Sequence, residues 1–298
     1  MEVVVSGEKP LWLRIRPPCV EPFAELKGLV DESGVATVCQ ESHCPNMSEC
    51  WSSRTLTFMV MGDSCTRGCR FCNVRSCGKG EVLDVEEPRR LAISLQKLGL
   101  KYAVITTVCR DDLVDQGAGH LANCVSLVKE LNPELVVEVL AQDFRGDLGL
   151  VRRVGGLVDV FGHNLETVKR LQSKVRDRRA GYEQSLSVLR EVARVFPGVV
   201  VKSGLMVGLG ESEKEVVEVF RDLVSVGVSI VSVGQYLRPR KGLLDVVEYV
   251  RPEQFKRYEV LGREAGLKVV VSGPFVRSSY RAYEAYMHCV SRDSKKRV

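Results

Sequence analysis

The feature of this sequence that most constrains its fold is a repeated alternation of apolar runs with amphipathic segments, which begins near Thr55. The apolar runs are nearly continuous and rich in β-branched residues, as expected for strands buried on both faces of a parallel sheet. The amphipathic segments between them predict helices that cover the sheet. The predicted strands are Thr55–Met61, Tyr102–Thr106, Leu135–Leu140, Val158–Phe161, Val199–Met206 and Ile230–Val233.

The predicted helices begin with residues typical of helix starts. Pro88 suits a first-turn position, and Ser212 followed by Glu215 resembles a capping box. Another helix is expected from Pro252 to about Ala265, and a last short strand at Lys268–Ser272. The six strand–helix units predict an α/β fold, a partial (βα)6 parallel barrel rather than a complete barrel. The other predicted helices are Pro88–Leu98, Leu121–Leu131, Tyr182–Phe196 and Ser212–Val226.

The chain is expected to have three parts. Residues 1–54 are rich in proline and lack sustained periodicity, so they predict an irregular N-terminal arm. Residues 55–271 form the predicted barrel, and residues 272–298 form a C-terminal extension. In barrels of this kind, functional residues lie on loops at the carboxyl ends of the strands. We therefore expect the active site at that end.

Composition and charge argue against several classes of protein. With 298 residues, 45% hydrophobic and 27% charged, the chain is expected to be soluble and globular. No apolar run approaches the ~18 residues of a membrane span, and Met1–Pro10 has no apolar signal core, so we expect a cytoplasmic protein without a membrane partner. The net charge of +5, part of it in a solvated tail at Lys295–Arg297, suits solubility or an acidic protein partner. It does not indicate nucleic acid.

Cysteine is the unusual component. The chain has 11 cysteines, an odd number, and six of them lie in two tight groups between Cys39 and Cys72. A secreted disulfide framework would be small, even-numbered and preceded by a signal peptide. The clustered thiols therefore predict metal binding in a reducing compartment.

The first group, Cys65-x3-Cys69-x2-Cys72, directly follows the first predicted strand. A loop with this spacing can place three thiolates around a cuboidal iron–sulfur cluster and leave one iron open to a small molecule. Zinc is the alternative, with Cys77 as a fourth ligand. The aromatic Phe71 before the last cysteine favours the cluster.

The second group, Cys39-x4-Cys44-x5-Cys50, lies in the N-terminal arm. It also offers three thiols without an obvious fourth. His43 would complete a Cys₃His zinc site, although it is adjacent to Cys44 and neighbouring residues rarely reach one ion. Spacing alone does not separate a cluster from zinc here.

The first group, with its aromatic Phe71, resembles the signature of the radical S-adenosylmethionine (SAM) superfamily. The resemblance implies that one iron chelates the amino and carboxylate groups of SAM. An electron from the cluster then cleaves the sulfonium and gives a 5′-deoxyadenosyl radical. Phe71, Asn164, Lys202 and Arg238 are the predicted cofactor-binding residues. The last three are our candidates for contacting the ribose and carboxylate of SAM, although each of these could instead brace a loop. The glycines of Gly204–Glu211 either let the backbone approach SAM or form a tight turn.

The two cysteine groups together are similar to those of lipoyl synthases, which also end in an Arg-Ser-Ser-Tyr motif. Arg277–Tyr280 matches that motif, and the resemblance implies that Ser279 ligates an auxiliary cluster with Cys39, Cys44 and Cys50. Other stretches that look like this family are Lys9-Pro10, Trp12–Arg14, Arg110–Leu113, Asp143–Gly146, His163–Thr167, Lys202–Glu211 and Gly234–Pro239.

The resemblance implies a reaction and its partners. An octanoyl chain on a lysine of a lipoyl carrier domain, of the glycine-cleavage H protein or 2-oxoacid dehydrogenase E2 type, receives sulfur at C6 and C8. Two SAM molecules are used, one [4Fe–4S] cluster starts the radical chemistry, and the auxiliary [4Fe–4S] cluster is the sulfur source. A small redox protein is the expected electron donor. The cysteines of the second group and Ser279 are therefore expected to take part directly in catalysis.

Two other classes of function stay open from the sequence. One is a different radical SAM sulfur-inserting enzyme, similar to biotin synthase, and the other is a zinc module that binds nucleic acid. Arg110–Asp112 is either an ion-pair network at the mouth of the barrel or part of the site. The remaining cysteines are interpreted as departures from the family's pattern that remove no expected ligand, or as small buried apolar residues or bystanders. They are Cys19, Cys77, Cys109, Cys124 and Cys289.

Overall fold

A seven-stranded, wholly parallel sheet forms the centre of the computed structural model, which describes residues 9–14, 24, 26–28, 30–31, 34–42, 44–52 and 55–295. The strands lie in chain order, β1-β4-β5-β6-β7-β8-β9, and among these residues β1 and β9 each pair on one side only. The sheet is thus an open barrel, and the predicted fold class is confirmed. Its strands are β1 Thr57–Val60, β4 Tyr102–Thr107, β5 Val136–Leu140, β6 Val160–Gly162, β7 Val200–Val207, β8 Ile230–Gln235 and β9 Val269–Gly273.

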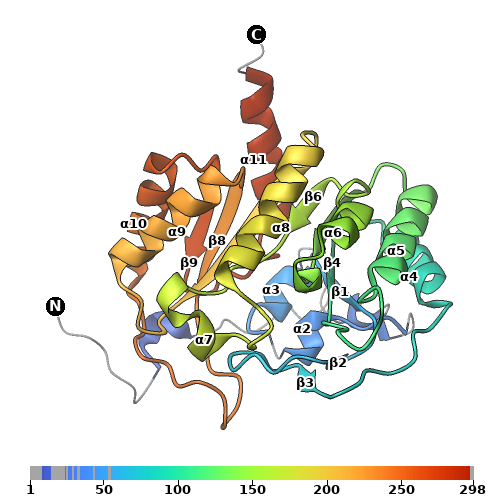
Figure 1. The fold of residues 1–298 in the computed structure, drawn as a ribbon, viewed down its shortest axis with the longest axis horizontal. Helices are drawn as coiled ribbons and strands as arrows, with labels where there is room; N and C mark the ends of the chain where they lie inside the picture. The colour runs from blue at the N-terminus through green and yellow to red at the C-terminus, as the bar shows by residue number, and fades with distance from the viewer. Residues whose placement is uncertain are drawn as a thin grey trace.

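Helices cover the outside of this sheet (Figure 1). The capping box at the start of α9 is formed as predicted, because Ser212 accepts from the Glu215 N–H and Glu215 accepts from the Ser212 N–H. Only α6 was not expected among them. It is short, and Asp147 caps it by accepting from the N–H groups of Gly149 and Leu150. The covering helices are α4 Glu87–Leu98, α5 Ala118–Leu131, α6 Leu148–Gly155, α8 Tyr182–Val195, α9 Glu213–Ser225 and α10 Pro252–Glu264.

The N-terminal arm is more ordered than its sequence suggests. Two short helices, α2 (Val38–Glu41) and α3 (Met47–Ser52), carry its cysteines. Thr37 caps α2 and forms an antiparallel bridge to Phe58 of β1, so the arm is attached to the edge of the barrel. His43 and Cys19 lie outside the described residues. A 3-10 turn, η1 (Leu11–Leu13), precedes this region.

A C-terminal helix, α11 (Ala282–Lys295), packs against the amino-terminal ends of several strands. Its Ala282 joins Tyr102 and Val160 in one apolar cluster, while Ala285 and Cys289 join Ile230 in another. The extension after β9 is therefore largely helical, which the sequence did not predict. Lys296 and Arg297 of the expected tail lie outside the described residues.

The small elements gather where the strands end. In Figure 1, α2, α3, β2 and β3 lie at the lower side of the view, opposite the C-terminus. They bring the N-terminal arm beside the loops that follow the strands. No described helix is long and apolar enough to cross a membrane. The remaining elements are β2 Ser64–Cys65, β3 Arg75–Ser76, η2 Phe144–Gly146, η3 Lys169–Leu171 and α7 Gln172–Val175.

Candidate active site

The loop after β1 presents the first cysteine group with its sulfur atoms already hydrogen-bonded. Cys65 Sγ accepts from the backbone N–H groups of Arg67 at 3.4 Å and Cys109 at 3.3 Å. Cys69 Sγ accepts from the Asp177 N–H at 3.3 Å. Hydrogen bonds of this kind stabilise thiolates and tune iron–sulfur clusters.

The electrostatics of these three thiols fit an iron–sulfur cluster. Burial is the main cause that raises the pKa of Cys69 to about 11 and that of Cys72 to about 12, and negative charge on Cys65 contributes to both shifts. The pKa of Cys65 is lowered to about 6, first of all by a hydrogen bond from the Cys109 thiol. Three neighbouring thiolates are stable together only beside positive charge, which iron supplies.

A buried ion-pair network holds this loop. Arg67 donates from Nη2 to Asp111 Oδ1 and from Nη1 to Asp143 Oδ2, both at 2.8 Å. Its side chain is 3% exposed, and burial of both carboxylates is offset by these bonds. Asp177 also accepts from the Gly68 N–H at 2.9 Å, and Arg179 donates to the Thr66 carbonyl at 2.6 Å. Loops that follow several strands of the sheet thus act together to hold the cysteine loop in place.

The Arg110–Asp112 stretch separates into two roles. Asp111 belongs to the network around Arg67, and its carboxylate also accepts from Thr66 Oγ1 at 2.9 Å. Arg110 and Asp112 pair with each other at 2.9 Å. The stretch is therefore an ion-pair network at the mouth of the barrel, one of the two interpretations that the sequence allowed.

His163 supports the same region from inside the barrel. Its Nδ1 lies 2.9 Å from the Ala141 carbonyl and its Nε2 lies 2.8 Å from Ser185 Oγ. Burial lowers the pKa of His163 to about 4, and the nearby positive charge of Arg176 lowers it further. The imidazole is therefore neutral, donating from Nδ1 and accepting at Nε2.

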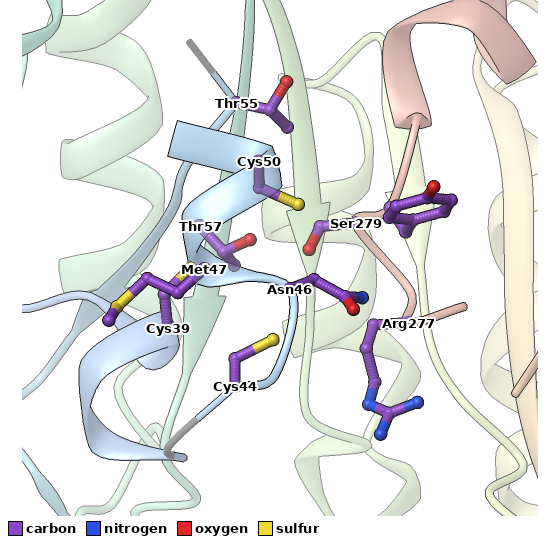
Figure 2. Close-up of a pocket in the computed structure, with 10 residues that line it drawn as sticks. Cys39, Cys44, Asn46, Met47, Cys50, Thr55, Thr57, Arg277 and Ser279 are labelled. Carbon is purple, nitrogen blue, oxygen red and sulfur yellow. The ribbon is translucent and has the colours of Figure 1, made fainter. Parts of the chain in front are cut away.

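The second cysteine group meets the C-terminal segment in one small cavity. Cys39 comes from α2, Cys50 from α3 and Cys44 from the turn between them. Ser279 comes from the segment between β9 and α11 and lies on the other side of this cavity from α2 (Figure 2). The other lining residues are Asn46, Met47, Thr55, Thr57, Arg277 and Tyr280.

Two contacts join the arm to the C-terminal segment. Asn46 donates from its side-chain amide to the Phe275 carbonyl. Tyr280 donates from its hydroxyl to Glu49 Oε1 at 2.8 Å. Both contacts span most of the chain, so this site forms only when the two ends meet.

The charges around the second group also suit an anionic cluster. Burial and the neighbouring thiols raise the pKa of Cys50 to about 12, and burial raises that of Cys44. Arg277 lies beside Cys44, and within the described ranges no carboxylate forms an ion pair with its guanidinium. Arg277 donates to the Val276 carbonyl at 2.7 Å, and its charge lies beside thiols without a carboxylate partner among the described residues, which fits a site for a negatively charged cluster.

A larger cavity of about 380 Å³ connects the two groups. Its lining includes Cys39, Cys44 and Ser279 of the second group's site and Phe71 and Cys72 of the first group's loop. Its volume lies in the range of small-molecule sites. The remaining lining residues include Val38, Pro45, Thr106, Leu140, Asn164, Glu166, Gly204, Leu205, Met206, Ser232, Gly234, Gln235, Tyr236, Leu237, Arg238, Val276, Arg277 and Ser278.

Three of the four predicted SAM contacts line this cavity: Phe71, Asn164 and Arg238. Asn164 Nδ2 donates to Ser278 Oγ at 2.7 Å, and Arg238 pairs with Asp245. A Cβ at Gly204 would lie 2.7 Å from Asn164 Oδ1, so a larger residue would displace the Asn164 side chain. Gly204 therefore lets the backbone of β7 approach the Asn164 side chain.

Lys202, the fourth, does not line either cavity. It lies near the start of β7, and its ammonium is 2.8 Å from both carboxylate oxygens of the buried Glu138. Tyr102 donates to the same carboxylate. The ammonium is thus part of a buried polar cluster inside the barrel, away from the carboxyl ends of the strands.

Glu166 is a cavity residue that the sequence did not single out. Its backbone has φ of 67°, and its N–H donates to the Gly204 carbonyl at 3.1 Å. Burial raises the pKa of its carboxyl. Its place just beyond the predicted strand Val158–Phe161 was the available signal, since polar residues at strand ends face the site.

Comparisons with known proteins agree with this arrangement. The Radical SAM superfamily matches residues 59–223. The chain is 52% identical over 284 residues to the lipoyl synthase of Anaeromyxobacter dehalogenans, covering 95% of this chain and 96% of that protein. It is 48% identical over 289 residues to the lipoyl synthase of Thermus thermophilus, covering 97% and 90% respectively.

The chain belongs to the lipoyl synthase family. It is therefore a radical SAM enzyme whose reaction is sulfur insertion, with [4Fe–4S] clusters, SAM as cosubstrate and a lipoyl carrier protein as substrate. The fold agrees as well. The X-ray structure of the FeFe-hydrogenase maturase HydG from Carboxydothermus hydrogenoformans superposes with a TM-score of 0.58 at 12% identity, over 90% of this chain and 69% of that one.

Proposed function

We propose that the protein inserts sulfur at C6 and C8 of an octanoyl chain carried on a lysine of a lipoyl carrier domain, with the two cysteine groups holding separate clusters. One observation carries the proposal: thiols of both groups line the same cavity of about 380 Å³. A chain that enters this cavity can meet SAM at one wall and a sulfur donor at the other. Sulfur insertion at an unactivated carbon needs that proximity.

Cys65, Cys69 and Cys72 hold the cluster that binds SAM, and Cys39, Cys44, Cys50 and Ser279 hold the auxiliary cluster. When bound, the first cluster supplies the electron that cleaves SAM, and the second supplies sulfur. The arm of residues 1–54 and the extension of residues 272–298 thus serve the sulfur donor, while residues 55–271 serve radical generation.

Three side chains orient SAM in the cavity. The Asn164 amide and the Arg238 guanidinium offer hydrogen bonds to its carboxylate and ribose, and Phe71 packs against it. Arg238 must exchange its exposed partner Asp245 for SAM, which costs little because Asp245 is 81% exposed. Glu166 adds an acceptor for the ribose hydroxyls or the amino group of SAM.

Apolar side chains form the remaining wall of the cavity. Leu140, Leu205 and Val276 face it, and they suit an alkyl chain that has no hydrogen-bonding groups. They also exclude water from the space between the two cysteine groups. A radical formed there is then protected from side reactions.

Ser279 and Arg277 define the auxiliary site chemically. A serine oxygen is a poorer match for soft iron than a thiolate, so Ser279 is the ligand that leaves most readily when the cluster is opened. Arg277 compensates the negative charge that the three thiolates bring. Its position between the two cavities supports this role.

The carrier protein is proposed to be an octanoylated domain of the glycine-cleavage H protein or 2-oxoacid dehydrogenase E2 type, and the electron donor a small redox protein. The net charge of +5 suits association with acidic partners of both kinds. The grouped cysteine thiols require a reducing compartment, which supports the cytoplasm as the location.

The proposal is tested by an anaerobic single-turnover assay with reconstituted protein, SAM, dithionite and an octanoyl-lysyl peptide, read by mass spectrometry. We expect the peptide to gain two sulfur atoms. Cys44→Ala and Ser279→Ala should form 5′-deoxyadenosine and leave the peptide unthiolated. Cys289→Ala, which removes a buried thiol of α11 far from the cavity, is the matched control and should behave as the wild type.

Two results would contradict the proposal. If protein with both clusters forms 5′-deoxyadenosine but leaves the peptide unthiolated, the substrate assignment is wrong. If Cys44→Ala still adds two sulfur atoms, the second cysteine group is not the sulfur donor.

A further inference from the structure

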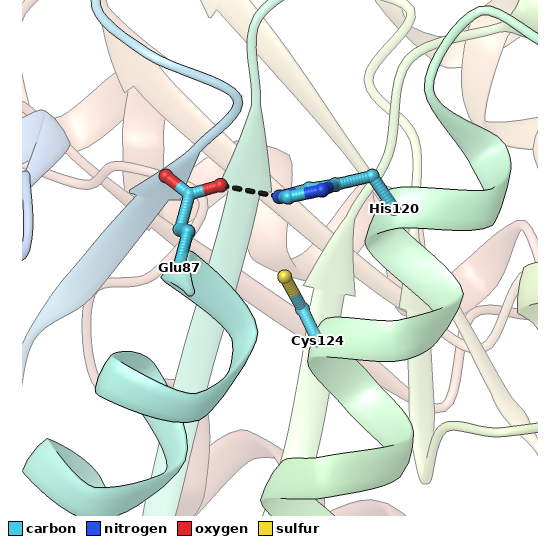
Figure 3. A group of neighbouring side chains, drawn as sticks. All are labelled: Glu87, His120 and Cys124. Atoms are coloured by element: carbon cyan, nitrogen blue, oxygen red, sulfur yellow. Dashed lines mark hydrogen bonds and ion pairs between the residues drawn. The ribbon is translucent and has the colours of Figure 1, made fainter. Parts of the chain in front are cut away.

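A third group of metal-ligating side chains lies outside both cysteine groups. Glu87 is the first residue of α4, and His120 and Cys124 lie one turn apart on α5. One ligand atom from each residue lies within 4.8 Å of the other two. Figure 3 shows the Glu87 carboxylate, the His120 ring and the Cys124 sulfur converging between the two helices. We propose that they form a site for one divalent cation of the zinc type.

The donor set matches this ion. Carboxylate, imidazole and thiolate are the three protein ligands that zinc takes, and three protein ligands leave a fourth position for water. His120 and Cys124 are four residues apart on one helix, so they project from the same face. The His120 side chain is 8% exposed and that of Glu87 is 16% exposed, which leaves a path for an ion and a water.

Without an ion, only two of the three side chains form a hydrogen bond with each other. His120 Nε2 and Glu87 Oε2 are 2.5 Å apart and satisfy each other, while the Cys124 thiol faces this pair from a fully buried position. Burial and the Glu87 charge both disfavour its thiolate. A divalent cation bound to carboxylate and thiolate would cancel two negative charges and use all three side chains.

The surroundings already orient the carboxylate. The Met61 N–H donates to Glu87 Oε2 at 3.0 Å. Hydrogen bonds of this kind to ligating carboxylates fix their direction in metal sites. A bound ion would keep the carboxylate in place and hold α4, α5 and Met61 together.

The position of Met61 connects the proposed cation site to the loop that follows β1. Met61 is the first residue after β1 and has a left-handed φ of 71°. The loop with Cys65, Cys69 and Cys72 begins just beyond it. A cation at Glu87, His120 and Cys124 therefore anchors the start of the radical SAM loop without contacting either cysteine group.

The test uses protein with both iron–sulfur clusters in place, so that the six grouped cysteines are occupied. Zinc is added anaerobically, excess is removed with a weak chelator, and zinc, iron and sulfide are measured together. We expect about one zinc per chain, with zinc-edge X-ray absorption showing one sulfur and otherwise nitrogen and oxygen neighbours. Zinc should also raise the Tm of the wild type.

Three variants make the result specific. His120→Ala and Cys124→Ser should lose the zinc and the zinc-dependent rise in Tm, with iron and sulfide unchanged. Glu87→Gln keeps an acceptor for the Met61 N–H and should bind zinc at least tenfold more weakly. Cys289→Ser, another buried cysteine, is the matched control and should bind zinc as the wild type does.

The proposal is overturned if wild-type protein retains no zinc, or if Cys124→Ser retains as much as the wild type. It is also overturned if the absorption spectrum shows several sulfur neighbours, because zinc would then occupy the grouped cysteines. None of these results bears on sulfur insertion, which the peptide assay measures separately.

Discussion

The two cysteine groups differ in how the chain assembles them. Cys65, Cys69 and Cys72 lie on one short loop, and the barrel supplies N–H···S bonds and the buried Arg67 network around them. The second group needs α2, α3 and Ser279, which come from opposite ends of the chain. It is joined by the Asn46–Phe275 and Glu49–Tyr280 contacts.

Charge separates them as well. Arg67 is shared between two buried carboxylates, so the positive charge beneath the first group is already neutralised without a cluster. Arg277 beside the second group has no such ion pair within the part of the chain that the structure describes. The first site is thus preorganised for repeated use. The second is completed by what it binds, which suits a cluster that is consumed.

The largest expected effect separates the two groups functionally. Cys69→Ala should abolish both 5′-deoxyadenosine and thiolated product, because the SAM-binding cluster loses a ligand. Cys50→Ala should abolish only the thiolated product. Quantifying both molecules in one anaerobic reaction decides the matter, and equal loss of 5′-deoxyadenosine in the two variants would contradict the division of roles.

The next effect concerns stability. Arg67→Met should lower the free energy of unfolding by about 3–5 kcal/mol, because Asp143 would be left buried without its cation and Asp111 would keep only the longer pair with Arg179 at 3.4 Å. The SAM-binding cluster should be lost more readily than the auxiliary one. Chemical denaturation with iron analysis measures both, and Arg75→Met, which removes an exposed ion pair, should cost little. Similar losses in the two variants would show that the network does not hold the loop.

Arg277→Met should act on the other site. Removing this positive charge should lower the reduction potential of the auxiliary cluster by roughly 40–170 millivolts, since a unit charge a few ångströms away contributes roughly 1–4 kcal/mol. The SAM-binding cluster should keep its potential, and Arg277→Lys should restore most of the shift. Redox titration followed by electron paramagnetic resonance distinguishes the clusters. An equal shift in both clusters would refute a local role for Arg277.

The smallest expected effect is a pH dependence of stability that arises from His163 inside the barrel. His163 has its pKa lowered to about 4 by burial, so the unfolded chain, with a histidine pKa near ~6.5, binds more protons below that pH. The contribution of neutral His163 to the free energy of unfolding is present above about pH 6.5 and is lost as the pH falls toward 4. Between pH 7 and 5.5 we expect the wild type to lose about 1 kcal/mol more than His163→Gln. Parallel denaturation curves at the two pH values would exclude this contribution.

The barrel could be predicted from the sequence because each element carries its own pattern. The strands begin and end within a few residues of the expected bounds, and the Ser212 capping box is formed. The helices α2 and α3 are too short for periodicity to show them. The helix α11 follows a motif rather than a repeat, and its partners Tyr102 and Ile230 are distant in sequence.

The site residues show the same limit. Cysteine spacing and the Arg-Ser-Ser-Tyr motif indicated which side chains gather at each cavity. Lys202 was expected at the site, but it lies at the third position of β7, which continues to Val207. The rule that function lies at the carboxyl ends of strands would have excluded it. Glu166, which lies beyond β6, satisfies that rule and was missed.

The distance along the chain between Cys39 and Ser279 has a consequence for biosynthesis. Protein domains fold as they leave the ribosome, N-terminal segments first. The SAM-binding loop can therefore be formed while Ser279 is still in the exit tunnel, whereas the sulfur-donor site must wait until nearly the whole chain has emerged. A chain truncated before Phe275 would keep the Arg67 network but lack Ser279 and the contacts that fasten the arm. Incomplete translation products would thus keep the radical-generating ligands but lack a complete sulfur-donor site.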